Sequence, residues 1–217
     1  MSSGLRVRLE RDRNQPPIVY LPEPSLKGRL SLEEAITCRR SVREFSAEPV
    51  TQAQLSQVLW AAQGITDKGR ALRAVPSAGV TYPLEVYVVC GKDSVAGMSA
   101  GVYHYSVAQH SLTLHRGGDF RADLARTALS QEFISEAPLT IVICASFGRT
   151  TRGYGGRGER YVYIEVGHAG QNIYLQAAAS GLATVAIGAF RDEAVREALQ
   201  LDVECQSLYL MPVGKPA

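Results

Sequence analysis

One predicted helix limits the possible folds of this chain more than any other segment. The stretch ERYVYIEVGHAGQNIYLQAAAS, which Gly181 ends, carries two apolar stripes at helical spacing instead of one. The first stripe is Val162, Val166, Ala169, Ile173 and Ala177, and the second is Tyr163, Gly167, Gly170, Tyr174 and Ala178. A helix without a polar face is expected to be buried on all sides. It therefore belongs either to the centre of the core or to an interface between two copies of the chain.

The segments around this helix predict further helices and strands. Two capping boxes, Ser31 with Glu34 and Thr51 with Gln54, open the helices LEEAITCRR and AQLSQVLWAAQ. Periodicity and turn residues then predict, in order, strand LEVYVVCG, hairpin strands GVYHYS and SLTLHRG, helix DFRADLARTALS, strand LTIVICAS, loop RTTRGYGGRG, the long helix, strand TVAIGAF, helix DEAVREALQ and strand SLYLMPVG. This alternation favours a sheet that is covered by helices.

Composition and length predict one domain with a short arm. Residues 1–30 are charged and then rich in proline, which predicts an extended arm, and we place a single domain at 31–217. The 23 lysines and arginines nearly balance the 21 acids, so neither nucleic acid nor an anionic membrane is expected as a partner. The N-terminus lacks an apolar signal region, and no apolar run reaches the roughly 18 residues of a membrane span. We therefore expect a cytoplasmic protein.

Two motifs suggest chemistry but also have simpler explanations. GYGGRG has the glycine spacing of a dinucleotide-binding fingerprint and would make the chain an NAD-binding Rossmann dehydrogenase. The insert RTTR before it, and the lack of an acid about 20 residues later, favour a flexible glycine loop instead. Glu165 and His168 have the i, i+3 spacing of metal-binding pairs. Because no second pair accompanies them, we expect both to be structural and no metal to be bound.

The segment RRSVREF places three arginines within five positions of a chain whose net charge is only +2. Two of them, Arg39 and Arg40, would fall in the last turn of a helix, where the helix dipole favours cations. A second basic loop, from Arg70 to Arg73, runs into PSAG, and Lys215 follows the last strand. Guanidinium and ammonium groups beside small residues are typical of a site for a phosphorylated planar cofactor.

In order and spacing, five motifs resemble those of the FMN-dependent nitroreductase family from Ser31 onward: RRSVREF, PSAGVTYPLEVYVV, YGGRGERYVYIEVGHAGQNIYLQAAASGL, TVAIGAF and MPVGK. Within that family, the chain is most similar to the peptide azoline (thiazole/oxazole) dehydrogenase branch. The resemblance implies an α+β fold, a three-layer sandwich with helices around a mixed central sheet. It also implies an intertwined homodimer that binds FMN at each subunit interface, with the long helix in the dimer core.

The resemblance also implies which residues bind FMN. The arginine segment would hold the phosphate, the ribityl chain and the pyrimidine edge, with Lys215 as a second phosphate cation. The PSAG loop would lie beside the isoalloxazine from the partner subunit, and the Gly188 N–H would face flavin N5. The implied cofactor-binding residues are Arg39, Arg40, Ser41, Arg43, Ser77, Ala78, Gly79, Ile187, Gly188 and Lys215.

The implied reaction is two-electron hydride transfer through flavin N5 by ping-pong alternation, from NAD(P)H to nitro or quinone acceptors. The alternatives are azoline oxidation in a modified peptide, and a flavin-binding protein without turnover. Azoline dehydrogenases resemble one another in a lysine–tyrosine pair, where this chain has Gly153 and Tyr154. Tyr154 is therefore the candidate catalytic residue for proton transfer, and it lacks the cationic neighbour that would lower its pKa.

Overall fold

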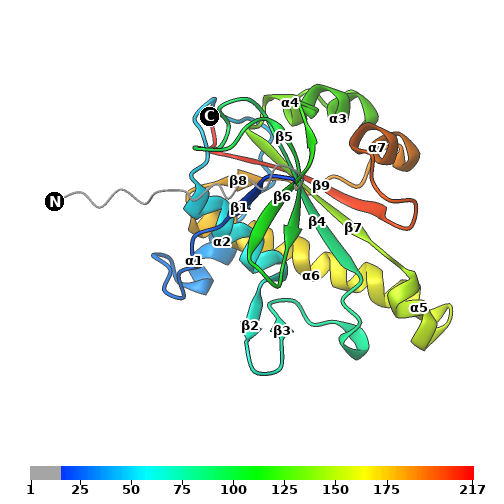
Figure 1. Cartoon of the computed structure of the whole chain (residues 1–217). Helices are drawn as coiled ribbons and strands as arrows, with labels where there is room; N and C mark the ends of the chain where they lie inside the picture. Colours follow the sequence, from blue (N-terminus) through cyan, green and yellow to red (C-terminus); the bar gives the residue numbers. More distant parts are fainter. Residues whose placement is uncertain (1–15) are drawn as a thin grey trace.

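The computed structural model describes residues 16–217. Seven strands form one sheet in the order β1-β6-β5-β4-β7-β9-β8, and every ladder between them is antiparallel (Figure 1). A parallel bridge between Ser41 and Thr184 extends the β8 edge, which makes the sheet mixed. The strands are β1 Ile18–Tyr20, β4 Leu84–Cys90, β5 Gly101–Ser106, β6 Ser111–Gly117, β7 Leu139–Ala145, β8 Ala183–Thr184 and β9 Gln206–Gly214, and a separate hairpin consists of β2 Ile65–Asp67 and β3 Leu72–Arg73.

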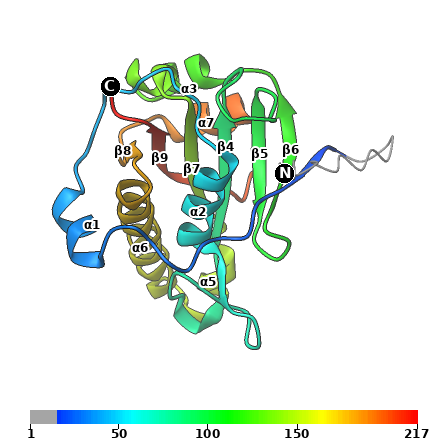
Figure 2. The same cartoon turned by 90° about the vertical axis from the view of Figure 1, so that its left-hand side faces the viewer.

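Helices cover both faces of this sheet and complete three layers. The helices α2 and α6 pack against one face, and Figure 2 shows them next to each other in front of the strands. The helices α3, α4 and α7 pack against the other face. Each face of the sheet has its own hydrophobic core, and successive residues of β4 point into one or the other. Val88 faces α2 and α6, whereas Val89 faces α3, α4 and α7. The helices are α1 Leu32–Cys38, α2 Gln52–Gln63, α3 Arg121–Thr127, α4 Phe133–Glu136, α5 Gly148–Tyr154, α6 Arg157–Ala179, α7 Asp192–Leu199 and the 3-10 turn η1 Ala78–Val80.

The long predicted helix is α6, and only one of its two apolar stripes is fully buried within a single chain. The stripe from Val162 to Ala177 lies inside the core, as expected. Outside this stripe, Tyr163 and Ile164 are 54% and 48% exposed. The expectation of burial on all sides is therefore wrong for one chain by itself, because the side of α6 that carries Tyr163 and Ile164 remains open to solvent.

Three predicted boundaries are wrong. The first helix ends at Cys38 rather than Arg40, since the chain turns extended at Arg39 and then runs to the bridge at Ser41. The expected loop at 149–158 is instead helix α5, which a bend at Gly155 separates from α6. The expected strand TVAIGAF pairs as a strand only at Ala183–Thr184, with one further bridge at Ile187.

The described part of the N-terminal arm is extended and lies on the domain. Its strand β1 pairs with β6 at the edge of the sheet, and Ser25 exchanges hydrogen bonds with the Gln57 side chain of α2. Residues 1–15 of the predicted arm lie outside the described residues. None of the helices in residues 16–217 has the length and hydropathy needed to cross a membrane.

Candidate functional site

Tyr174 on α6 joins segments that are far apart in the sequence. Its hydroxyl lies 2.9 Å from Ser41 Oγ and accepts a hydrogen bond from the Ala186 backbone N–H at 2.7 Å. The Arg39 guanidinium lies over the Tyr174 ring, 5.2 Å from the ring centroid. The arginine segment and the AIGA segment therefore meet at the C-terminal half of α6. In the sequence, Tyr174 is recognisable only as part of an apolar stripe, and nothing there indicates this role.

The three arginines of this segment have few protein partners. Arg40 Nη1 donates to the carbonyls of Thr37 and Arg39 at 2.8 and 2.7 Å, and so caps the end of α1. The Arg43 guanidinium lies 5.8 Å from the centroid of the Phe133 ring. Within residues 16–217, no carboxylate forms an ion pair with any of the three. Their positive charges remain available to an anion from outside the chain.

Gly188 lies a few residues after β8, and Lys215 directly follows β9, the neighbouring strand at this edge of the sheet. Gly188 is exposed, its N–H donates to no described residue, and the space beside its Cα is open. The preceding residue, Ile187, is buried and exchanges two backbone hydrogen bonds with Leu210, which fixes the direction of the Gly188 N–H. Lys215 is a less independent cation than the sequence suggested, because it forms an ion pair with Glu48.

The second predicted cofactor segment, Ser77–Gly79, belongs to a strained loop. Gly79, Val80 and Tyr82 have φ of 59°, 58° and 44°. Such positive values cost energy in residues other than glycine, and they persist where surrounding contacts fix them. A Cβ on Gly79 would lie 2.7 Å from the Tyr154 hydroxyl. The structure therefore places the predicted catalytic Tyr154 directly against this loop.

A cluster of polar side chains, Gln63, Arg73 and Glu165, lies next to the same loop. From the sequence, Glu165 was expected to be only structural. Glu165 is 3% exposed. Burial raises the pKa of its carboxyl to about 7, although the Ser77 side chain and the Arg73 charge act in the opposite direction. Arg73 itself donates to Gln63 Oε1 at 2.9 Å, and its guanidinium lies 4.2 Å from the centroid of the Tyr82 ring.

These two groups of predicted site residues lie toward opposite ends of α6. Glu165 and Tyr174 are nine residues apart, which is about 14 Å along a helix axis. Figure 1 shows α1 and β8 near one end of α6, and α5 near the other. A single chain therefore does not bring Ser77–Gly79 to Arg39 and Lys215.

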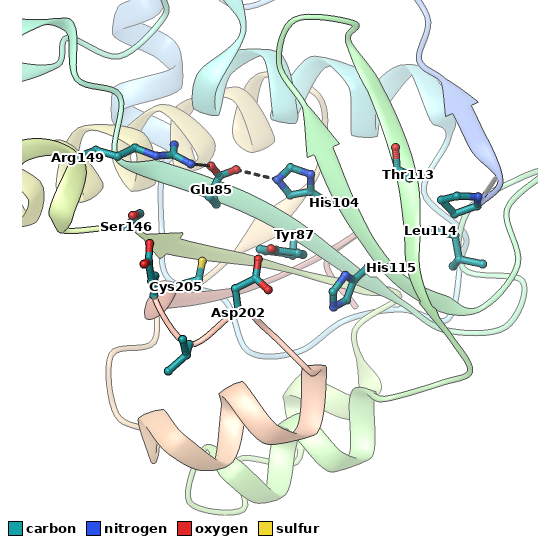
Figure 3. A pocket seen from close by; sticks show the side chains of 13 residues that line it. Glu85, Tyr87, His104, Thr113, Leu114, His115, Ser146, Arg149, Asp202 and Cys205 are labelled. Carbon is teal, nitrogen blue, oxygen red and sulfur yellow. Dashed lines mark hydrogen bonds and ion pairs between the residues drawn. The ribbon is translucent and has the colours of Figure 1, made fainter. Parts of the chain in front are cut away.

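A cavity of about 850 Å³ lies on the opposite face of the sheet, and none of the predicted site residues lines it (Figure 3). At its wall, His104 Nε2 donates to the Glu85 carboxylate at 2.7 Å, and Arg149 pairs with the same carboxylate. Burial alone would raise the pKa of Glu85, but the hydrogen bonds from His104 and Arg149 outweigh it and hold the pKa below its usual value. Arg149 also donates to the Tyr82 carbonyl at 3.0 Å, so this ion pair anchors one end of the strained loop.

Known proteins share both the sequence pattern and the fold of this chain. Residues 36–215 match the Nitroreductase family. The chain belongs to the nitroreductase family. A Methanocaldococcus jannaschii protein named as a nitroreductase is 47% identical over 186 residues, which cover 86% of this chain and 91% of the relative. A crystal structure described as a nitroreductase from Ralstonia eutropha JMP134 superposes with a TM-score of 0.82 at 29% identity, and the match covers 99% of this chain and 96% of that one.

Relatives of this nitroreductase-family chain also include a microcin-processing protein. The Escherichia coli microcin B17-processing protein McbC is 28% identical over 150 residues, covering 63% of this chain and about half, 51%, of the relative. The E. coli microcin synthetase McbBCD complex with truncated pro-MccB17 has the same fold, with a TM-score of 0.71 at 22% identity over 100% of this chain and 84% of that one. The predicted family, its oxidoreductase class and the α+β sandwich are confirmed.

The motif GYGGRG has a packing role in this chain through its last glycine, Gly158. A dinucleotide fingerprint needs a strand of a parallel sheet followed by a tight turn, whereas β7 has antiparallel neighbours and leads into α5. The Rossmann alternative is therefore wrong. Gly158 instead allows α5 to approach α6 closely, since a Cβ there would lie 2.9 Å from the Thr151 Cα.

Replacing Gly158 with alanine is expected to lower the free energy of unfolding by about 1–3 kcal/mol, because backbone atoms of α5 must move away. Gly156→Ala is the matched control, since no atom lies within 4 Å of a Cβ at that position. Denaturant unfolding of both variants measures the difference. Equal stability of the two would show that the α5–α6 contact does not depend on Gly158.

Proposed function

We propose that this nitroreductase-family protein is an FMN-dependent oxidoreductase that takes hydride from NAD(P)H and passes it to a nitro or quinone-type acceptor. The observation that carries the proposal is that the arginine segment and the AIGA segment meet at Tyr174. Three guanidinium groups without carboxylate partners in residues 16–217 lie at one edge of the sheet, together with the Gly188 N–H, which donates to no described residue. This donor set fits a cofactor that has a phosphate at one end and a hydrogen-bond acceptor at the other.

Each group has a distinct task in this proposal. Arg39, Arg40 and Arg43, with Ser41, bind the phosphate and ribityl portions, and Lys215 adds a further positive charge. The Gly188 N–H, which the backbone hydrogen bonds of Ile187 hold in a fixed direction, would donate to the flavin ring. When bound, FMN supplies the hydride chemistry, accepting and releasing two electrons at N5. The fixed positive charge and the backbone donor favour the negative charge that accompanies reduction.

We further propose that two copies of the chain complete each site. The loop Ser77–Gly79 and Tyr154 lie at the other end of α6 from the arginine segment, so a two-fold axis across α6 would exchange these groups between subunits. The exposed apolar side chains Tyr163 and Ile164 on α6 support this arrangement, because an interface would cover them. Residues 77–79 of one subunit would then lie beside the isoalloxazine ring that is bound to the other.

A second candidate substrate is an azoline ring in a modified peptide. The relationship to the microcin B17-processing protein and the likeness to a chain of a peptide-bound synthetase complex support it. Within this chain, the proximity of the Tyr154 hydroxyl to Gly79 also supports it, because Tyr154 would then be the proton-transfer group beside the loop that this proposal assigns to the ring. In this alternative, the peptide would be the electron donor in place of NAD(P)H, and a separate acceptor would take up the electrons.

The visible absorption spectrum of the purified protein tests the proposal. We expect the visible absorption bands of a bound flavin, and bleaching of the longest-wavelength band when NADH or NADPH is added without oxygen. A colourless preparation that FMN does not reconstitute would contradict the proposal. Flavin that neither nicotinamide reduces would instead favour a peptide substrate or a flavin-binding protein without turnover.

A further inference from the structure

The cavity on the face of the sheet that α3, α4 and α7 cover is lined by none of the residues that the proposed function uses. Its volume of about 850 Å³ lies within the range of roughly 300–1,000 Å³ that is typical of small-molecule sites. Its wall is formed mainly by β4, β5 and β6 and by the loop between α7 and β9 (Figure 3). The cavity is therefore large enough to hold a small organic molecule.

Tyr87 on β4 is a buried polar side chain that points into this cavity. It is only 6% exposed, and within residues 16–217 its hydroxyl forms no hydrogen bond. Figure 3 shows it between His104 and His115, with the hydroxyl end directed into the cavity. The two imidazole centroids lie 4.9 and 5.6 Å from the Tyr87 ring centroid. Because buried hydroxyl groups nearly always have a hydrogen-bond partner, this one points to a ligand.

The two histidines beside Tyr87 use their donor atoms elsewhere. His104 Nε2 donates to the Glu85 carboxylate at 2.7 Å, and His115 Nε2 donates to the Gln200 carbonyl at 2.9 Å. A neutral imidazole has one donor and one acceptor, so Nδ1 of each ring is an acceptor. Within the described part of the chain, neither Nδ1 atom has a hydrogen-bond partner. This part of the wall therefore offers acceptors to a ligand.

The charges around the cavity are mostly negative. Among the described residues, three carboxylates line it, those of Glu85, Asp202 and Glu204, against the single guanidinium of Arg149. Arg149 pairs with Glu85, whereas Asp202 and Glu204 form no ion pair within residues 16–217. Burial above all raises the pKa of Tyr87, and the charges of Glu85 and Asp202 act in the same direction, so its hydroxyl stays neutral. Two negative charges are thus left for a cation from outside the chain.

We propose that this cavity binds a small organic cation that carries a guanidinium or primary ammonium group. Such groups are positively charged and have donors but no acceptors, which complements a wall of carboxylates and acceptor atoms. The charge would lie beside Asp202 and Glu204, and the N–H groups would donate to the Tyr87 hydroxyl oxygen and to the imidazoles. The ring of Tyr87 adds a further attraction for a cation.

The chemistry of the wall disfavours two other ligands. An anion would have to compete with Glu85 for Arg149, because that guanidinium is already paired. A metal ion is not favoured either, since the described residues contain no group of three or more histidine, cysteine or acidic side chains placed to hold one. The proposal does not rest on the flavin function, because the arginine segment and the Ser77–Gly79 loop lie elsewhere.

Calorimetric titration of the full-length protein with agmatine tests the proposal, since this probe has a guanidinium at one end and an ammonium at the other. We expect one site per chain in the wild type. Asp202→Asn combined with Glu204→Gln should bind agmatine roughly tenfold more weakly, because two exposed charge contacts are lost. Tyr87→Phe should also bind more weakly, and it keeps the ring and the core packing while it removes the hydroxyl.

The controls match the charge and the shape of the probe. Glu132→Gln with Glu136→Gln removes two exposed carboxylates next to α4, at the other end of β7 from the cavity, and should leave the affinity for agmatine unchanged. N-pentylurea has a similar length but no charge and should not bind. Equal affinity of the Asp202 and Glu204 variant and this control, or binding of the neutral probe as tightly as agmatine, would overturn the proposal.

A second titration separates a free amine from a basic side chain. The capped peptide acetyl-Ala-Arg-Ala-amide carries the same guanidinium, so tighter binding of the peptide than of agmatine would support the site with a basic peptide as its ligand. Tighter binding of agmatine would support a free amine. A colourless protein that binds agmatine would reject the flavin function and support this site. A flavin-loaded protein that binds neither probe would overturn the cation site and leave the flavin function in place.

Discussion

Replacement of both Arg40 and Arg43 with alanine is expected to lower FMN affinity by at least about 100-fold while the protein stays folded. A charge-assisted hydrogen bond contributes about 1.5–3 kcal/mol, and each factor of ten in affinity corresponds to about 1.4 kcal/mol. Both side chains are exposed and lack carboxylate partners in residues 16–217, so their loss leaves no buried charge behind. Fluorescence titration of the apoprotein with FMN measures the change.

The control for this experiment removes the same charge elsewhere. Arg126→Ala with Arg196→Ala deletes two exposed or half-exposed arginines on α3 and α7, which pair with carboxylates of their own helices. Its FMN affinity should stay within about threefold of the wild type, since surface ion pairs contribute little. If the Arg40 and Arg43 variant binds FMN as tightly as this control, the two arginines are only a helix cap and a surface contact.

Ile164→Arg is expected to separate the proposed dimer and to release FMN. Ile164 is about half exposed in the single chain, so arginine fits there without disturbing the core of one subunit. An interface over α6 would instead have to bury an unpaired guanidinium, which costs several kcal/mol. Light scattering coupled to size exclusion gives the molecular mass, and the ratio of absorbance at the flavin band to that of the protein gives the FMN content.

Val203→Arg is the matched substitution on the opposite face of the sheet. Val203 is 78% exposed at the rim of the cavity, far from the α6 surface. We expect this variant to keep both its mass and its flavin. An Ile164→Arg protein that remains a flavin-loaded dimer would show that the open face of α6 is not the interface.

Much of the fold could be predicted because local signals agreed with the final packing. Both capping boxes, at Ser31 and Thr51, form as the spacing predicts. The stripe along α6 also marks its buried face correctly. The failure at 149–158 has a physical cause, since glycine favours loops in sequence statistics. Here Gly158 allows two helices to touch.

The site was less predictable, because its chemistry depends on tertiary neighbours. The arginines and Gly188 could be recognised from motifs, but the link between them through the Tyr174 hydroxyl depends on three segments meeting. Glu165 left one signal in the sequence: it lies at helical spacing from Val162 and Ala169, within the buried stripe. Its neighbour His168, by contrast, is exposed. Without the structure, nothing indicated that Ser77 would lie against that carboxyl.

The hydrogen bonds of the Tyr174 hydroxyl bear on the order in which the protein folds. It connects Ser41 with Ala186, and Ser41 and Tyr174 are 133 residues apart in the sequence. A contact of such long range costs loop-closure entropy while the intervening chain is unfolded, so this edge of the sheet is expected to assemble late in folding. A ligand that binds only the finished arrangement stabilises it by mass action. Uptake of the cofactor would thus act as a final closing step, and its retention would distinguish fully folded molecules from those in which the last strands have not docked.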